Sequence, residues 1–366
     1  MKIINSSIVF ENDLPQLSAK NAFFPNVIEI SENNLVAVSV IGQAFESVDS
    51  ASYVHFSNDN GKTWTKPKKM FNFGRKSKKI SEGCKITKLN NGNLIAVGQL
   101  NDRSNPDLPV GNPATGGLLD DAVFYSFSKD SGKTWCKAKE IKCAWGPHVE
   151  ASAPIVELKD GTLITPITGF PDWDGKMHGK LCGRALRSTD GGKTWNDDSI
   201  CMDFDKPVTC YEQRMCQLDS GTVVCIGWNE NVETGERLEN HYTLSFDNGK
   251  TWTKPVSTGI LGQASSVCAI GGEKLLALHA VRRDTDKPGI YACVVDLSEG
   301  KWNIVEKEII WQPSVPMVKD TKMAEIFSFL KFGQPSAIKL KNGNLLMIHW
   351  FAVEGQYKTI VNEIEL

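Results

Sequence analysis

The chain has 366 residues and a formal net charge of −2, so it lacks the basic excess of a nucleic-acid-binding protein. It contains no run of 18 apolar residues, and it opens without the hydrophobic block of a secretory signal peptide. Its ten cysteines include no Cys-x-x-Cys pair. We therefore expect a cytoplasmic protein with buried free thiols, no metal, no cofactor, and neither nucleic acid nor membrane as a partner.

An eight-residue pattern, Ser-x-Asp-x-Gly-x-Thr-Trp, occurs four times, beginning at Ser57, Ser128, Ser188 and Ser245. An Asp in a tight turn accepts hydrogen bonds from backbone N–H groups, and Gly supplies the positive φ that closes the turn. The Trp ring is then buried as a local anchor. Each copy predicts the turn of a β-hairpin with a structural role, so its Asp and Trp are poor catalytic candidates.

A second repeat consists of an apolar residue, a turn and a short apolar run. Its six copies cover residues 30–38, 89–97, 158–164, 218–226, 270–278 and 340–348. Asn-Gly and Asp-Gly between apolar runs are strong hairpin signals, and units of about 60 residues are the size of propeller blades. We predict an all-β fold, a single six-bladed β-propeller domain over residues 1–366 with four-stranded blades. The Gly turn joins the inner two strands of a blade, the eight-residue pattern joins the outer two, and residues 3–10 pair with 359–366 to close the ring.

The innermost strands of a propeller start around a central channel, and the repeat locates their first residues. Counting back 12 positions from each second strand gives Phe23, Glu82, Ala151, Tyr211, Gln263 and Gly333, and a shift of one adds Phe24, Glu150, Glu212 and Gln334. Carboxylates that share a cleft perturb each other's pKa, as general acid–base chemistry requires. A carboxylate pair across a sugar is the usual glycosidase arrangement. The alternative is that each carboxylate caps a strand end or binds backbone N–H groups.

Residues just past the second strands also approach this mouth. They include Asp102, Trp228, His279, Arg283 and Trp350. Aromatic rings there suit stacking on a sugar or plugging the channel, and Arg283 suits either carboxylate binding or a solvated loop. Arg214 points from an inner strand, where its charge needs a partner such as Glu212 or Glu150. His279 is equally compatible with a packed strand histidine.

The eight-residue pattern resembles the Asp-box of the sialidase superfamily, and the architecture is similar to that superfamily over nearly the whole chain. The resemblance implies three arginines that grip the sialate carboxylate, a Tyr nucleophile polarised by a Glu, and an Asp acid/base. The family's Glu corresponds to Glu212, in the run Glu212-Gln-Arg-Met-Cys-Gln-Leu218-Asp-Ser-Gly221. The acid/base Asp corresponds to Asp49 in the loop before the first box.

Other residues occupy three of the family's positions. The first arginine falls on Phe23-Phe24-Pro25, the second on Trp228, and the Tyr on Gln334. Loss of the Tyr removes the covalent route, and loss of the arginines removes the clamp that defines sialate binding. The resemblance therefore implies the scaffold with a rewritten site, and not an ordinary sialidase.

Residues and resemblance together predict a sialidase-like, exo-acting glycoside hydrolase that releases a terminal sugar at the central pocket, with a small saccharide or glycan terminus as its partner. The candidate catalytic residues are Glu212, Glu150, Glu82, Asp49 and Tyr211. The candidate substrate-binding residues are Arg214, His279, Arg283, Gln334, Trp228, Trp350 and Asp102. The alternatives are a polysaccharide lyase with His279 or Tyr211 as base, a non-catalytic carbohydrate-binding propeller, and a protein-interaction propeller.

Overall fold

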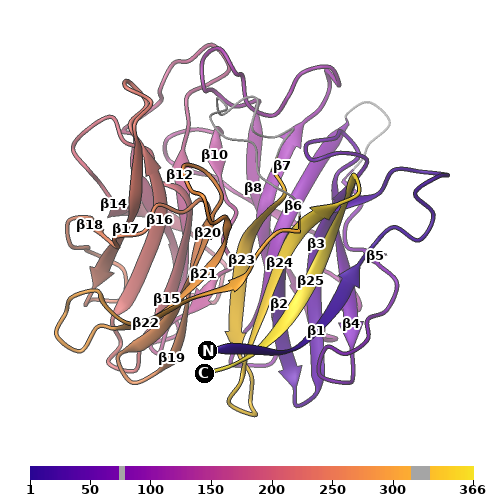
Figure 1. Cartoon of the computed structure of the whole chain (residues 1–366). Coiled ribbons are helices and arrows are strands. Elements are labelled where there is room, and N and C mark those ends of the chain that lie inside the picture. Colours follow the sequence, from indigo (N-terminus) through magenta and orange to yellow (C-terminus); the bar gives the residue numbers. More distant parts are fainter. Residues whose placement is uncertain (74–78, 315–329) are drawn as a thin grey trace.

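The computed structural model describes residues 1–73, 79–314 and 330–366, and these residues form β-strands and no helices. The strands make six antiparallel sheets that stand around a common axis as the blades of a propeller (Figure 1). The described residues contain no helix that could span a membrane. The predicted six-bladed, four-stranded architecture is confirmed, with one irregularity, because the inner strand of the third blade is divided into two short pieces.

From the innermost strand outward, the first three blades are as follows. Blade 1 has β2 (Asn21–Ser31), β3 (Asn34–Gly42), β4 (Ala51–Ser57) and β5 (Lys68–Lys69). Blade 2 has β6 (Ile80–Lys88), β7 (Leu94–Asp102), β8 (Asp121–Ser128) and β9 (Lys139–Ile141). Blade 3 has β10 (Val149–Glu150) and β11 (Val156–Glu157), then β12 (Leu163–Gly169), β13 (Gly183–Ser188) and β14 (Asn196–Met202).

The remaining blades follow the same order. Blade 4 has β15 (Tyr211–Gln217), β16 (Val223–Glu230), β17 (Arg237–Ser245) and β18 (Val256–Ser257). Blade 5 has β19 (Ser265–Gly271), β20 (Lys274–Val281), β21 (Gly289–Asp296) and β22 (Asn303–Trp311). Blade 6 has β23 (Phe332–Lys339), β24 (Leu345–Val353), β25 (Gln356–Glu365) and, on its outside, β1 (Lys2–Phe10).

The ring is closed by the two ends of the chain. Strand β1 pairs antiparallel with β25, and the two ends lie side by side (Figure 1). The hydroxyl of Ser6 donates to Oδ1 of its register partner Asn362 at 2.8 Å. The closure predicted from the sequence is confirmed, and β25 has no exposed edge.

The turns lie where the two repeats predict them. The Gly turns join the innermost and second strands, as at Gly92, whose φ of 87° closes the turn between β6 and β7. The boxes join the third and fourth strands. In the third box, Oδ1 of Asp190 accepts the N–H groups of Lys193 and Thr194, both at 2.9 Å. These hydrogen bonds, with one from the Thr194 hydroxyl, lower the pKa of Asp190.

Hydrophobic layers between adjacent blades form the core. One layer joins blades 2 and 3 through Ile95, Val97, Leu163 and Ile167, and the ring of Trp195 from the third box packs against it. Similar layers join blades 4 and 5, and blades 5 and 6. Each blade therefore buries both of its faces against the two neighbouring blades, as in other β-propellers.

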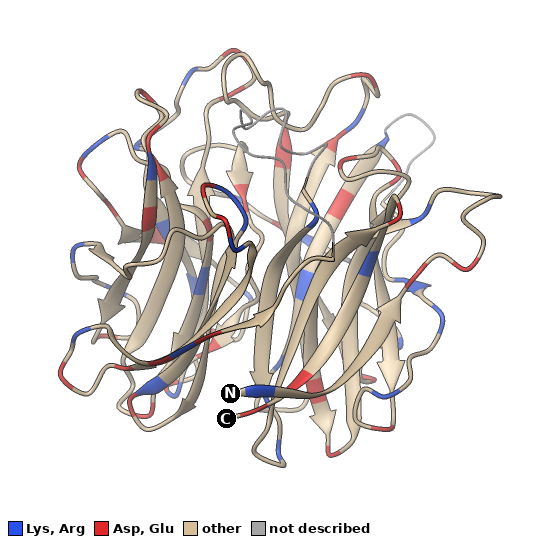
Figure 2. Ribbon diagram, viewed as in Figure 1, with Lys and Arg blue, Asp and Glu red and all other residues tan. Residues whose placement is uncertain are grey.

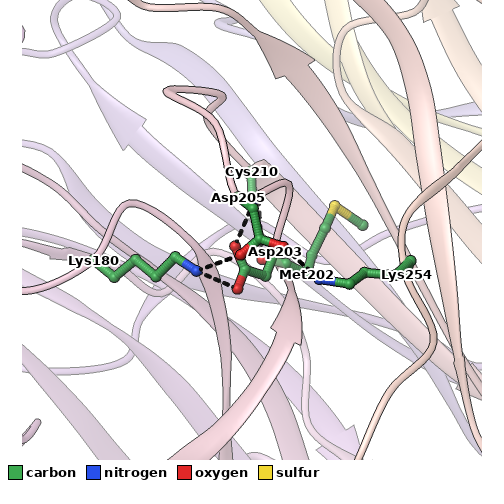
Figure 3. A network of polar contacts seen from close by, with 6 residues as sticks. All are labelled: Lys180, Met202, Asp203, Asp205, Cys210 and Lys254. Carbon is green, nitrogen blue, oxygen red and sulfur yellow. Dashed lines mark hydrogen bonds and ion pairs between the residues drawn. The ribbon is translucent and has the colours of Figure 1, made fainter.

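Charged residues lie mainly on the connecting loops, and a smaller share falls within strands (Figure 2). One surface network lies over the connection between blades 3 and 4 (Figure 3), where Lys180 pairs with Asp203 and Asp205, and Lys254 also pairs with Asp205. Exposed ion pairs of this kind contribute about 0–1 kcal/mol each. They orient the connection without contributing much to stability.

Candidate functional site

Two glutamates from adjacent blades meet at the start of the inner strands. Glu150 ends β10 of blade 3, and Glu212 is the second residue of β15 in blade 4. The backbone N–H of Glu212 donates to Oε2 of Glu150 at 3.1 Å, and the hydroxyl of Ser152 donates to its Oε1. The structure therefore brings together two of the three carboxylates that the sequence places at the mouth.

The environment of Glu150 favours its protonated form. Burial raises the pKa of Glu150 to about 7, and the nearby charge of Glu212 adds to this shift. The hydrogen bonds from Ser152 and from the Glu212 backbone, together with the charge of Arg214, oppose it. Glu150 is thus suited to hold a proton near neutral pH, as a general acid must.

Glu212 is held by two side-chain donors. The indole Nε1 of Trp228, on β16, donates to Oε2 at 2.8 Å, and Nε2 of Gln334, on β23, donates to Oε1. Hydrogen bonds from N–H groups stabilise a charged carboxylate. Three positions identified through the family resemblance, Glu212, Trp228 and Gln334, therefore form one contact cluster that joins blades 4 and 6.

The inner strands of blades 1, 4 and 6 share an unusual backbone conformation at the mouth. Phe24, Glu212 and Gln334 have φ values of 51°, 42° and 44°, and each lies at an irregularity in the strand register. Such a conformation costs about 1–3 kcal/mol for a residue other than glycine, and it persists where the surroundings fix it. It turns the side chains of Glu212 and Gln334 toward each other.

A buried lysine joins the cluster from blade 2. The Nζ of Lys85, on β6, donates to Oε1 of Gln334 at 3.2 Å and to the carbonyls of Phe24 and Pro25 at 2.6 and 3.2 Å. Burial, followed by the charge of Arg214, lowers the pKa of Lys85, whereas Glu212 and Glu150 act in the opposite direction. Lys85 is absent from the residues that the sequence singles out.

Two arginines complete the charge balance. Arg214 donates to the Ser152 hydroxyl at 3.2 Å and to the Gln213 carbonyl at 2.8 Å. Arg282 donates to the Phe332 carbonyl at 2.7 Å, and burial lowers its pKa to about 10. Burial also lowers the pKa of Arg214, and the charge of Glu212 opposes the lowering in both arginines.

A narrow pocket, too small to be called a cavity, lies in the hub. It is lined by Pro25, Asn26, Lys85, Pro154, Arg214, Gln334 and Ser336. In the repeat, the apolar run of the second strand begins at residue 35, 94, 163, 223 or 345. Counting back nine positions from these residues gives five of the lining residues, namely Asn26, Lys85, Pro154, Arg214 and Ser336. A count of nine as well as 12 would have identified Lys85 from the sequence.

Glu82 does not join the carboxylate pair. Its two oxygens accept the backbone N–H and the hydroxyl of Ser52, on β4 of blade 1, both at 2.7 Å. Burial raises its pKa to about 7. Side chains alternate along a strand, so Glu82 lies on the face opposite that of Lys85, three residues later. The expectation of three converging carboxylates is therefore corrected to two.

Two other catalytic candidates take different positions. Asp49 lies exposed in the loop between β3 and β4, where its Oδ1 accepts the N–H of Gln43 at 3.1 Å. The ring of Tyr211 packs on Trp228 with centroids 4.2 Å apart, and burial raises its pKa. Tyr211 therefore supports the indole that donates to Glu212, whereas Asp49 binds the backbone of its own exposed loop.

Two of the substrate-binding candidates are fully buried. Nδ1 of His279 contacts Oδ1 of Asn240 at 2.9 Å, and burial lowers the pKa of the imidazole to about 3. Trp350 packs among aromatic rings that include Phe23 and Phe45. His279 is thus a packed strand histidine, and Trp350 belongs to an aromatic plug beside the channel.

The remaining candidates lie at the outer part of the mouth. Asp102 ends β7 and accepts the N–H of Ser104 at 2.8 Å. Arg283 is half-buried on the loop after β20, and the neighbouring Arg237 adds to the effect of burial in lowering its pKa, against Glu230. The part of the chain that the structure describes holds no cluster of side chains suited to a metal ion.

Comparisons with known proteins agree with this architecture. The family model for the BNR/Asp-box repeat matches residues 186–197, which span the third box. A structure of a protein of unknown function from Dyadobacter fermentans DSM 18053 aligns with a TM-score of 0.77 at 17% identity, over 100% of this chain and 99% of that one. A comparison with curated protein sequences finds no match.

Solved sialidases align over almost the whole chain. The NanB sialidase from Streptococcus pneumoniae aligns with a TM-score of 0.69 at 12% identity, over 98% of this chain and 70% of that one. The Trypanosoma rangeli sialidase in complex with sialic acid aligns with a TM-score of 0.64 at 14% identity, over 99% of this chain and 57% of that one. The chain therefore has the fold of the sialidase superfamily, a six-bladed β-propeller with Asp-box repeats.

Proposed function

We propose that the protein is a glycoside hydrolase that releases a terminal sugar at the hub of the propeller, with Glu150 and Glu212 as its carboxylate pair. The observation that carries the proposal is their juxtaposition, in which the Glu212 N–H lies 3.1 Å from Oε2 of Glu150. Two coupled carboxyls in different surroundings divide the roles of acid and base between them. A sugar is also consistent with the sialic acid bound by the Trypanosoma rangeli sialidase, which shares the fold.

The roles follow from the surroundings of each carboxyl. Glu150, with its pKa raised to about 7, donates a proton to the departing glycosidic oxygen. Glu212, with an N–H donor on each oxygen, acts as the charged carboxylate at the anomeric carbon. Water then completes the hydrolysis, and the two products are the free sugar and the alcohol of the leaving group.

The absence of an arginine at Phe23 and at Trp228 argues against sialate as the substrate. The family resemblance places a carboxylate-gripping arginine at each of these positions. Here an aromatic side chain occupies both, and Trp228 donates its indole N–H to Glu212 instead. We infer that the substrate is a saccharide whose recognition does not depend on that clamp.

The test is hydrolysis of a panel of 4-nitrophenyl glycosides by the wild-type protein, followed by Glu212→Gln and Glu150→Gln on the best substrate. We expect each substitution to lower kcat by at least about a hundredfold, the lower end of general acid–base contributions. Glu157→Gln is the matched control, because Glu157 lies at the other end of the inner strand of blade 3 and accepts the N–H of Asn90. Full activity in Glu212→Gln would overturn the assignment.

One observation favours a second candidate, a non-catalytic sugar-binding hub. All four oxygens of the pair already accept hydrogen bonds from protein groups, namely Ser152, Glu212 N–H, Gln334 and Trp228. A binding hub would retain an unchanged sugar, and Glu212→Gln would leave its affinity within a few-fold. The geometry does not favour a lyase, because His279 is fully buried and burial raises the pKa of Tyr211.

A further inference from the structure

The side chain of Lys85 connects three blades through one nitrogen atom. Its stem rises from β6 of blade 2, and its Nζ reaches two carbonyls of blade 1 and the amide oxygen of Gln334 in blade 6. The side chain is 4% exposed. A lysine ammonium has three N–H donors and accepts no hydrogen bond, so these three acceptors use all of its donors.

This contact determines which way the Gln334 amide faces. The amide carries one acceptor, Oε1, and one donor group, Nε2. In its ammonium form Lys85 only donates, so Oε1 faces Lys85, and the donor group is left to face Glu212. The reversed amide would set N–H against an ammonium and a carbonyl against a carboxylate, which are two repulsive contacts.

We propose that Lys85 is a positioning residue for the carboxylate pair. By fixing the Gln334 amide it keeps a donor on Oε1 of Glu212, and the proton that the two carboxyls share then resides on Glu150. The kinetic consequence rests on the proposed function. The order in which the two carboxyls titrate is a property of the folded protein and needs no substrate.

Lys85 also has a structural role that the test must separate from this one. Its contacts with the carbonyls of Phe24 and Pro25 hold the strained backbone of β2, where Phe24 has a φ of 51°. Removing the amine therefore destabilises the protein whether or not it orients Gln334. Loss of stability is not a diagnostic readout, whereas the titration of the carboxyl pair is.

The experiment is a carboxyl titration followed by NMR in protein labelled with ¹³C at the glutamate side chains. The variants are Lys85→Met, Gln334→Met and the double variant, and Glu150→Gln identifies the signals of the pair. In the wild type we expect two well-separated steps, with the upper one belonging to Glu150. Lys85→Met and Gln334→Met should each raise the lower step by about one pH unit, a tenfold change in proton affinity.

The double variant should shift that step no further than either single variant, because both remove the same hydrogen bond to Glu212. Lys88→Met is the matched control, since Lys88 lies on the same strand and donates to the Ile30 carbonyl in the same manner. An unchanged lower step in Lys85→Met, or fully additive shifts in the double variant, would overturn the proposal. If Lys85→Met does not fold, the test is made with Gln334→Met alone. An unchanged lower titration step in Gln334→Met would then overturn the proposal.

The kinetic arm separates this proposal from the proposed function. On the best glycoside, the acid limb of the kcat/KM profile should move to higher pH in Lys85→Met by the same amount as the lower titration step. If the wild type hydrolyses no glycoside, the proposed function fails, and the titration still decides the role of Lys85. A fall in kcat with an unshifted profile would show that Lys85 is only structural.

Discussion

Glu82 is buried and Glu150 is half-buried, and the pKa of each carboxyl is raised to about 7 by different causes. Burial alone raises the pKa of Glu82, against two hydrogen bonds from Ser52. For Glu150 the charge of Glu212 adds to burial. A raised pKa therefore identifies the reactive carboxyl only together with the geometry that places a second carboxylate beside it.

Glu82 leads to a prediction about stability and pH. Its folded-state pKa of about 7 lies above the ordinary 4.5, so between these values the folded protein binds more protons than the unfolded chain. The stability that this proton provides is present below pH 4.5 and is lost as pH rises through 7. Glu82→Gln should remove this pH-dependent loss. The free energy of unfolding of the variant, relative to that of wild type, should therefore be higher at pH 8 than at pH 5 by on the order of 1–3 kcal/mol.

Urea unfolding at the two pH values measures this difference. The exposed Glu32→Gln variant is the control. A Glu82→Gln variant whose deficit relative to wild type is the same at pH 5 and pH 8 would contradict the account of Glu82.

At the residue scale, the sequence predicted Glu150, Glu212, Trp228 and Gln334 as a group, because the repeat and the family resemblance both lead to these positions. It did not separate Glu82 from them. The count by 12 finds where each strand begins, but it does not determine which face a side chain takes once β-bulges shift the alternation in blades 1, 4 and 6. Lys85 was missed because the count of 12 leads only to the start of each inner strand, and Lys85 lies three residues further along.

At the scale of elements, the Asp-boxes divide structural work from chemistry. Each box joins the third and fourth strands of its blade, and the third strand ends opposite the mouth at which Glu150 and Glu212 lie. Four donors converge on Asp247 in the fourth box, from Ser245, Lys250 and Thr251, at 2.7–3.1 Å. The box is thus a self-contained turn that needs no ligand.

Replacing that carboxylate should affect stability alone. We expect Asp247→Ala to lower the free energy of unfolding by about 1–3 kcal/mol, because it removes the acceptor of the turn's hydrogen bonds. Glycoside turnover at saturating substrate should stay within about twofold of wild type. Thermal unfolding and the glycosidase assay measure the two quantities, with the exposed Asp198→Ala as control. Unchanged stability, or a loss of turnover in folded protein, would contradict the structural role.

Elements were the most predictable level because the repeats encode them directly. The Gly turns and the boxes both follow from local turn chemistry, which depends on a few adjacent residues. The division of the third blade's inner strand into β10 and β11 had no such signal. Pro154 lies between the two pieces, but Pro25 and Pro335 lie within the continuous inner strands of blades 1 and 6, so a proline alone does not predict the division.

At the scale of the whole molecule, the ring makes a site from residues that are far apart in the sequence. Lys85, Glu150, Glu212 and Gln334 come from four blades, and one path of hydrogen bonds links them. The pairing of β1 with β25 ties the start of the chain, which continues into blade 1, to blade 6, which carries Gln334. The sequence predicted this closure, since its two terminal stretches are β-rich and have no other partners.

A structure of Glu212→Gln crystallised with the glycoside that the wild type hydrolyses best is the most direct test of the account. We predict one intact sugar at the hub, with its glycosidic oxygen within hydrogen-bonding distance of the Glu150 carboxyl and its anomeric carbon beside residue 212. A sugar bound only on the outer loops, or a hub that stays closed while the wild type turns the substrate over, would contradict it.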